Sequence, residues 1–221
     1  MKTLEIFDLE KTMAKPYLSK FESPWEALSG IKDFIITLGP TLDKLFYEEI
    51  KPCVWVAKNA KIFESAYIDA PCIIGENTEV RHSAFIRGSA LIGDNCVIGN
   101  STEVKNSIIF DRVQIPHFNY VGDSILGYKS HLGAGAITSN VKSDKSLVTV
   151  MRNGQKIKTG LKKFGAIVGD CVEVGCQSVL CPGTVIGKNT NIYPLSLVRG
   201  FIPENSIFKN QDKIVPKTKT N

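Results

Sequence analysis

Aliphatic side chains recur at every sixth position through most of the chain, and small side chains stand two positions before most of them. The aliphatic series runs without a break over 56–104 and again over 168–198: Val56, Ile62, Ile68, Ile74, Val80, Ile86, Ile92, Ile98, Val104, then Val168, Val174, Leu180, Ile186, Ile192 and Val198. A period of six suits neither an α-helix nor a free-standing hairpin. It fits a short strand plus a turn, repeated along a parallel β-helix. The pattern predicts a mainly β solenoid over 51–204, with the aliphatic side chains inside and the small ones at the corners.

Three such hexads make one triangular coil, so residues 18 apart should stack on neighbouring coils. A solenoid buries its core only by stacking repeats, and this chain offers roughly six to seven coils.

Residues 1–50 lack the period. Ser23, Pro24 and Glu26 form a helix start, the apolar residues over 27–38 have helical spacing, and Gly39-Pro40 ends it. A shorter helix, interrupted by Pro16, is predicted over 9–21. We expect this segment to cap the first coil, because a solenoid end exposes unpaired backbone. Residues 205–221 are expected to be a C-terminal tail, whose basic part from Lys213 to Lys219 is a solvated end.

The period also slips between Phe110 and Leu126, and it is lost over 141–164. Within that gap, 147–150 and 156–158 are predicted to pair as a β-hairpin, because Asn153-Gly154 supplies the positive φ angles of a tight turn. Such an excursion is either a decorative loop or the border of a binding site.

Composition narrows the function classes. A net charge of +5 is mild, and it favours small anionic substrates over nucleic acid. No apolar run is long enough to span a membrane, and the first residues lack a secretory signal, so a cytoplasmic protein is expected. The six cysteines include no C-x-x-C pair, which predicts reduced thiols and no metal site.

The most informative stretch lies in the slip: His117-Phe118-Asn119-Tyr120-Val121-Gly122-Asp123, followed by Gly133-Ala134-Gly135-Ala136-Ile137-Thr138-Ser139-Asn140. These paired motifs and the hexads resemble left-handed β-helix acyltransferases with hexapeptide repeats. The likeness is to the acetyltransferase half of bifunctional N-acetylglucosamine-1-phosphate uridyltransferase/glucosamine-1-phosphate acetyltransferases and of archaeal sugar-1-phosphate nucleotidyltransferases. The resemblance covers roughly 74–200. It alone implies that the β-helix is left-handed.

The resemblance implies three catalytic residues. His117 matches the family's base, which takes a proton from the attacking sugar amine. Tyr120 matches a sugar contact, and Asn140 matches an amide against substrate and acyl donor. Three further positions match the acetyl-CoA site: Ala134, whose N–H faces the thioester oxygen, and Cys176 and Pro194, which replace small family residues.

Arg87 and Lys105 match the family's sugar-phosphate ligands. They occupy equivalent places in successive groups of three hexads, so they should stack about 4.8 Å apart on neighbouring coils, where a phosphate would relieve their repulsion. The alternative is that both are solvated turn residues near an acid such as Asp94 or Glu103. His131 replaces a family Asn; it is a sugar ligand, a second base, or an outward residue without a role.

Three hypotheses remain. The first is an acetyl-CoA-dependent N-acetyltransferase of an amino-sugar phosphate or nucleotide-linked amino sugar, working as a homotrimer with sites between subunits. The second is an acyltransferase with another acceptor or an acyl-carrier-protein donor. The third is a non-catalytic sugar-nucleotide-binding solenoid that regulates or scaffolds a nucleotidyltransferase. Fifty helical residues cannot replace the family's nucleotide-binding domain, so no uridyltransferase activity is expected.

Overall fold

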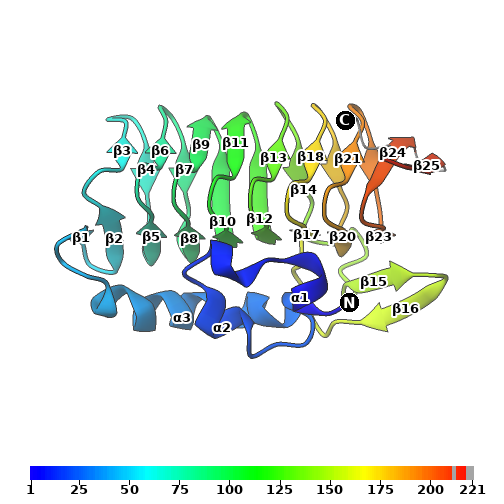
Figure 1. Cartoon of the computed structure of the whole chain (residues 1–221), viewed down its shortest axis with the longest axis horizontal. Coiled ribbons are helices and arrows are strands. Elements are labelled where there is room, and N and C mark those ends of the chain that lie inside the picture. The colour runs from blue at the N-terminus through cyan, green and yellow to red at the C-terminus, as the bar shows by residue number, and fades with distance from the viewer. Residues whose placement is uncertain (211–212, 218–221) are drawn as a thin grey trace.

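The chain winds into a three-sided parallel β-helix in the computed structural model, which describes residues 1–210 and 213–217 (Figure 1). The first face stacks β2 (Val54–Ala57), β5 (Cys72–Ile74), β8 (Ala90–Ile92), the second half of β10 (Glu103–Ile109), the second half of β12 (Tyr120–Leu126), β17 (Ala166–Val168), β20 (Thr184–Ile186) and β23 (Phe201–Ile202). The second face stacks β3 (Lys61–Ile62), β6 (Glu79–Val80), β9 (Val97–Asn100), β11 (Gln114–His117), β13 (His131–Leu132), β18 (Glu173–Val174), β21 (Asn191–Ile192) and β24 (Ser206–Asn210). The third stacks β4 (Tyr67–Ile68), β7 (Phe85–Ile86), the first halves of β10 and β12, β14 (Ile137–Thr138), β19 (Val179–Leu180) and β22 (Leu197–Val198). The predicted β-helix is confirmed, and it has more coils than expected.

The hexads explain this winding residue by residue. The aliphatic member of each hexad points inward, and Ile74, Ile86 and Ile98 are fully buried. The small member fits the corner: Cys72 and Cys96 are buried free thiols, and burial raises the pKa of each to about 12. The corner turns need positive φ, which Asn adopts more easily than most residues, and Asn77, Asn95 and Asn189 supply it.

The register accounts for the slip and the excursion. Val54 pairs with Cys72, which matches the predicted offset, but Val104 pairs with Val121, so this coil is shorter by a single position. His131 then pairs with Glu173, which lies further along the chain by a full coil plus the whole excursion over 141–164. Within the excursion β15 (Thr149–Arg152) and β16 (Gln155–Lys158) form an antiparallel hairpin, with φ of 50° at Asn153 and 75° at Gly154. The predicted hairpin is confirmed.

The N-terminal segment differs from the prediction in form and place. It comprises α1 (Thr3–Ile6), α2 (Lys15–Leu18) and α3 (Ile31–Leu38), with 3₁₀ helices η1 (Leu9–Lys11), η2 (Pro24–Gly30) and η3 (Gly39–Thr41), so no continuous helix covers 9–21. Its helices do not cap the first coil but lie along the first face (Figure 1), and only its last residues, in β1 (Tyr47–Lys51), pair with the first coil. Phe7 packs against Phe110 with its ring tilted and the ring centroids 4.9 Å apart, and Trp25 packs against Phe164.

The reason is the outward side of the first face. In six of the eight strands there, the outward residue between the small and the inward one is apolar and fully buried: Ile73, Leu91, Ile108, Ile125, Ile167 and Val185. A sheet that is apolar on both sides must be covered on both. The helical segment supplies that cover.

Extra antiparallel strands close both ends. β1 (Tyr47–Lys51) pairs with β2 at the first coil. At the other end, β24 continues the second face and β25 (Lys213–Pro216) pairs back onto it. The β-helix therefore runs past the expected boundary at 204 as far as β24, whereas residues 213–217 of the expected solvated end are mostly exposed. Residues 211–212 and 218–221 lie outside the described residues.

The packing of α3 gives a first prediction. Ile31 is fully buried, whereas Ile36 on the same helix is 39% exposed. Ile31→Ala should lower the free energy of unfolding by about 2–5 kcal/mol through lost burial and a cavity. Ile36→Ala is the matched control and should change it by less than about 1 kcal/mol. Equal effects in urea denaturation would mean that the helical segment is not packed on the first face as described.

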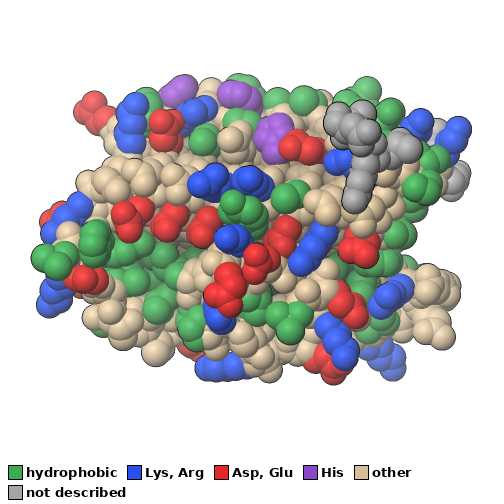
Figure 2. Space-filling view, in the orientation of Figure 1, with side chains coloured by type: hydrophobic (Ala, Val, Ile, Leu, Met, Phe, Trp, Pro, Cys, Tyr) green, Lys and Arg blue, Asp and Glu red, His purple; other side chains and the backbone are tan. Residues whose placement is uncertain are grey.

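Carboxylates stack along the corner between the first and second faces, and acidic side chains form a row in Figure 2. The Glu76 N–H donates to Asp94 Oδ1 (2.7 Å), and the Asp94 N–H donates to Asp111 Oδ1 (3.0 Å). Burial is the main cause that raises the pKa of Asp94, with a smaller contribution from Glu76. The protonated carboxyl group therefore favours folding at low pH, and this contribution is lost as pH rises through the raised pKa.

Asp94→Asn keeps the oxygen acceptor and removes the charge. We expect it to raise the melting temperature at pH 7, with the gain shrinking below about pH 4, where the wild-type carboxyl is protonated. Asp144→Asn is the control, because hydrogen bonds from Ser146 lower the pKa of that exposed carboxyl. A destabilised Asp94→Asn protein at pH 7 would contradict the argument.

Candidate functional site

His117 stands at the end of β11, at the corner where the second face turns into the third. Ala134, Cys176 and Pro194 occupy the same corner on the next coils: the Gly135 N–H donates to the His117 carbonyl (3.0 Å), and the Leu195 N–H to that of Cys176 (2.9 Å). The structure thus brings the predicted base and the three predicted acyl-donor positions into one exposed column. The His117 imidazole has no hydrogen-bond partner among the described residues.

The backbone of this column offers a free donor. Gly133 and Gly135 both use their N–H groups in hydrogen bonds, to Val174 and His117. The N–H of Ala134, between them, has no acceptor within the described residues. It lies one coil from His117, as the predicted oxyanion donor should.

Tyr120 and Asn140 meet at the other side of the third face. The Asn140 amide donates to Tyr120 Oη (3.1 Å) and to Asp123 Oδ2 (2.5 Å). Gly122 makes room for the phenol, because a Cβ there would lie 2.4 Å from Tyr120 Oη. Burial first, then the charges of Asp123 and Glu103, raise the pKa of Tyr120. Its hydroxyl therefore stays protonated and can donate a hydrogen bond to a ligand.

Asp123 is the centre of this network. The residue is 4% exposed; its carboxylate accepts from the Asn106 amide (2.8 Å) and lies 3.8 Å from Lys105 Nζ. The same Asn106 amide donates to the Leu28 carbonyl of η2. One buried carboxylate therefore joins two predicted site residues, Lys105 and Asn140, to the helical cover.

Arg87 and Lys105 stack as predicted, since the Arg87 N–H donates to Val104 in the next coil. Each has a carboxylate partner, however: Arg87 Nη1 lies 2.7 Å from Glu103 Oε1, and Lys105 faces Asp123. Their repulsion is compensated within the chain, so the stack alone does not require a bound anion. Of the acids that the alternative interpretation named, Glu103 is the partner and Asp94 is not.

His131 is not brought to the other site residues of its own chain. It lies on the second face, where its Nδ1 is 2.8 Å from Glu173 Oε2. Arg112 and Lys129 line a pocket with it, whereas Arg87 and Lys105 lie beyond the whole third face.

Sequence reasoning assigned no role to Asp123 and Asn106, although a signal was present. Asn106, Asp123 and Asn140 are evenly spaced along the chain, and their interval equals the shortened coil that pairs Val104 with Val121. They therefore stack at one corner, and the hydrogen bonds between them follow.

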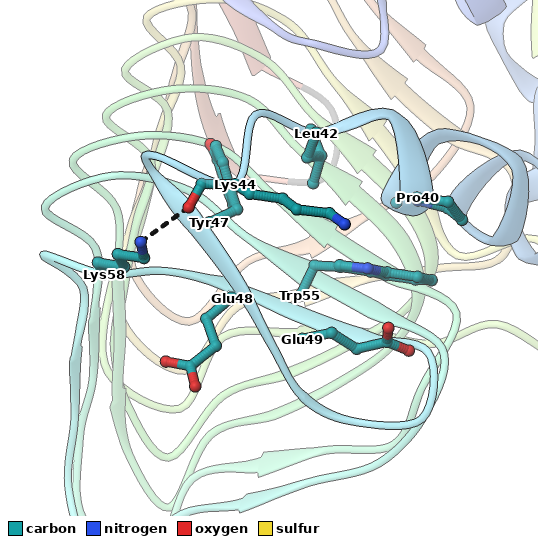
Figure 3. Close-up of a pocket in the computed structure, with 9 residues that line it drawn as sticks. Pro40, Leu42, Lys44, Tyr47, Glu48, Glu49, Trp55 and Lys58 are labelled. Atoms are coloured by element: carbon teal, nitrogen blue, oxygen red, sulfur yellow. Dashed lines mark hydrogen bonds between the residues drawn. The ribbon is translucent and has the colours of Figure 1, made fainter.

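A separate pocket of about 680 Å³ opens at the first coil, between β1, β2 and the end of α3 (Figure 3). Trp55 and Tyr47 line it, and Lys58 Nζ donates to the Lys44 carbonyl (2.7 Å). It contains none of the predicted site residues. The described residues hold no cluster of three or more His, Cys, Asp or Glu side chains suited to a metal ion, and none of the described helices could span a membrane.

Comparison with known proteins places these features in context. A family model described as the GMPPB C-terminal domain matches residues 68–161. The bifunctional sugar-1-phosphate nucleotidylyltransferase/acetyltransferase of Sulfurisphaera tokodaii is 31% identical over 93% of this chain and 55% of its own length. The bifunctional protein GlmU of Methanococcus maripaludis is 40% identical over 52% of this chain, but only 28% of that protein is matched.

A relative of similar length also matches. The uncharacterized acetyltransferase YaiX of Escherichia coli is 31% identical over 79% of this chain and 86% of its own length. Among solved structures, PerB from Caulobacter crescentus, in complex with CoA and GDP-perosamine, is 19% identical over 69% of this chain and 51% of that chain, with a TM-score of 0.37. A likeness at that score carries no argument about function.

Proposed function

Because the chain belongs to the family of hexapeptide-repeat acetyltransferases, we propose that it transfers the acetyl group of acetyl-CoA to the amine of an amino-sugar phosphate or a nucleotide-linked amino sugar. The observation that carries this proposal is the column that joins His117 to the free N–H of Ala134 on the next coil. Acyl transfer needs a proton acceptor and an oxyanion donor close together. This corner offers both.

In the proposed reaction the sugar amine attacks the thioester carbonyl. A C–N bond forms, the C–S bond breaks, and coenzyme A leaves as a thiol. The His117 imidazole takes the proton that the amine loses and passes it to the departing sulfur. The Ala134 N–H stabilises the negative charge on the carbonyl oxygen. Cys176 and Pro194, next in the column, would lie along the pantetheine arm.

The remaining site residues would hold the acceptor. Tyr120 and Asn140 present a hydroxyl and an amide suited to sugar hydroxyls. Arg87 is exposed and can exchange its Glu103 carboxylate for a phosphate, which also suits the guanidinium fork.

The proposed assembly is a homotrimer with sites between subunits. The third face supports it, since its outward side chains include Tyr67 (58% exposed) and Phe85 (38%), flanked by Phe118 (60%) and Leu195 (82%). An apolar face of this kind marks an interaction surface. A closed ring would cover this apolar face on every subunit.

Release of free thiol from acetyl-CoA in the presence of glucosamine-1-phosphate tests the function. Turnover supports it. No turnover with this acceptor, but turnover with another acceptor or an acyl-carrier-protein donor, would support the broader acyltransferase. Tight binding of a sugar nucleotide without any turnover would support the regulatory solenoid instead. We expect no nucleotidyl transfer.

Arg87→Ala should raise KM for a phosphorylated acceptor about tenfold or more, with a smaller change in kcat, because one charge-assisted hydrogen bond contributes about 1.5–3 kcal/mol. The matched control is Arg81→Ala, which removes an arginine paired with Glu79 at 3.0 Å on another part of the surface. An unchanged KM in Arg87→Ala removes this residue from the phosphate site.

A further inference from the structure

The second face carries a pocket of about 620 Å³ that the proposed reaction does not use within one chain. It is lined by Asn95, Arg112, Gln114, Lys129, Ser130, His131 and Glu173. Figure 2 shows Lys and Arg side chains beside a His side chain in the region of β11 and β13. Nearly all of its polar side chains are hydrogen-bond donors or cations, so its chemistry points to an anion.

Two of its cations stack on neighbouring coils. Arg112 and Lys129 stand at the same corner turn of successive coils, with φ of 61° and 55°. The Lys129 N–H donates to the carbonyl of Asp111, the residue before Arg112 (3.1 Å). Their backbones are therefore about one strand spacing apart, roughly 4.8 Å, and both side chains leave the turn in the same direction.

This pair differs from Arg87 and Lys105 in its charge balance. Within residues 1–210 and 213–217, neither the Arg112 nor the Lys129 side chain has an ion-pair partner. Lys129 Nζ instead lies 5.4 Å from the centre of the Tyr128 ring, and Lys11 Nζ lies 5.5 Å from the same ring. Arg112 and Lys129 therefore line the pocket without a direct carboxylate contact in the described part of the chain.

Asp111 lies at the same corner, but its carboxylate accepts the Asp94 N–H and makes no ion pair with Lys11, Arg112 or Lys129 within the described residues. At the other side of the pocket, Glu173 is occupied by His131 Nδ1 at 2.8 Å. That contact holds the imidazole ring in place at the edge of the pocket.

We propose that this pocket binds a phosphorylated small molecule through its phosphoryl group. The Arg112 guanidinium, the Lys129 ammonium and the His131 ring would surround the phosphoryl oxygens, and the Gln114 and Asn95 amides would add neutral donors. Phosphate suits such a set, because it has several acceptor oxygens and a charge that offsets stacked cations. The proposal does not depend on acetyl transfer.

The chain has three histidines, so imidazole NMR signals can be followed one by one while inorganic pyrophosphate is added to the full-length protein. We expect the His131 signals to shift along a saturable curve. Arg112→Gln with Lys129→Gln should weaken the binding read from His131 about tenfold or more, the scale expected for lost charge-assisted contacts. Arg87→Gln with Lys105→Gln should leave it within about twofold, since those residues lie elsewhere.

A third double variant, Lys142→Gln with Lys145→Gln, removes the same charge from the exposed loop before β15 and should also leave binding unchanged. Equal weakening in all three double variants would mean non-specific attraction and would overturn the proposal. So would His131 signals that do not move, or weakening confined to the Arg87/Lys105 variant. Thermal melts and the wild-type-like His82 signal verify that each variant is folded. Failure here would leave the thiol-release result untouched.

Discussion

Replacing His117 with alanine is expected to lower the rate of thiol release by about 10²–10⁴-fold, the usual contribution of a general base. The reason is positional. The imidazole is exposed at the head of the column that continues through Ala134, Cys176 and Pro194, and none of those three positions offers an imidazole, a carboxylate or an amine beside the free Ala134 N–H. Steady-state kinetics with acetyl-CoA and the acceptor give the measurement. The loss should fall on kcat, because the proton is taken only as the amine attacks.

His82 is the matched control for this prediction. It lies at the same corner two coils earlier, since the Ser101 N–H donates to its carbonyl and Asn100 of that next coil pairs with His117. It is exposed, and its ring lies 6.4 Å from that of Phe63. His82→Ala should retain wild-type turnover. A His117→Ala protein that retains most of its activity would contradict the assignment of His117 as the base. An equal loss of turnover in both variants would indicate general damage to the corner.

The hexad pattern was enough to predict the solenoid because each hexad determines its own local structure. An inward aliphatic residue and a small corner residue specify one short strand and one turn, and the coil follows by repetition. The hairpin could be predicted for the same reason, since the dipeptide Asn153-Gly154 favours a tight two-residue turn. The left hand came from the resemblance and not from the spacing, which is the same for either hand.

The position of residues 1–50 could not be predicted from that segment alone. The information lies in the solenoid, where every third hexad has an apolar outward residue such as Ile73, Leu91 or Ile108. The period of six identifies the inward position of each hexad and does not by itself show that the outer side of one face is apolar too. The helical segment covers that face because leaving it in water would cost more than ordering the helices against it.

The site, like the fold, could be predicted from the sequence only in part. His117, Ala134, Cys176 and Pro194 are far apart in sequence but fall into one column once the coil lengths are known, so the motif and the register together place them. The role of Glu173 was harder to predict, because it pairs with an imidazole on a neighbouring coil, and Glu103 was expected only as one of two alternative partners. Such contacts depend on side-chain direction across coils, which the spacing of one motif does not give.

Asp123→Asn should lower kcat by about 10–100-fold, on the scale of a few kcal/mol for a buried network that loses its charged member. The carboxylate accepts from Asn106 and Asn140 and faces Lys105 at 3.8 Å. An amide in its place has one oxygen, so one of the two donors loses its acceptor and the ammonium loses its counter-charge. Asn tolerates the φ of 50° at this corner, so the backbone is not the cause of the loss.

If Asp123 had a purely structural role, a different result would be expected. The variant Asp170→Asn distinguishes a structural role from a positioning role. Asp170 is also buried at a corner; it accepts the Asp8 N–H at 2.7 Å and the Tyr128 N–H at 2.9 Å, and it lies 3.5 Å from Lys188. Both variants should lose about 1–3 kcal/mol of stability, because each leaves a buried donor without its acceptor. Only Asp123→Asn should lose kcat per folded molecule, together with a raised KM for a phosphorylated acceptor, since only this carboxylate holds Asn140 and Lys105. If kcat falls equally in both, or in neither, Asp123 supports the fold and does not position the reacting groups.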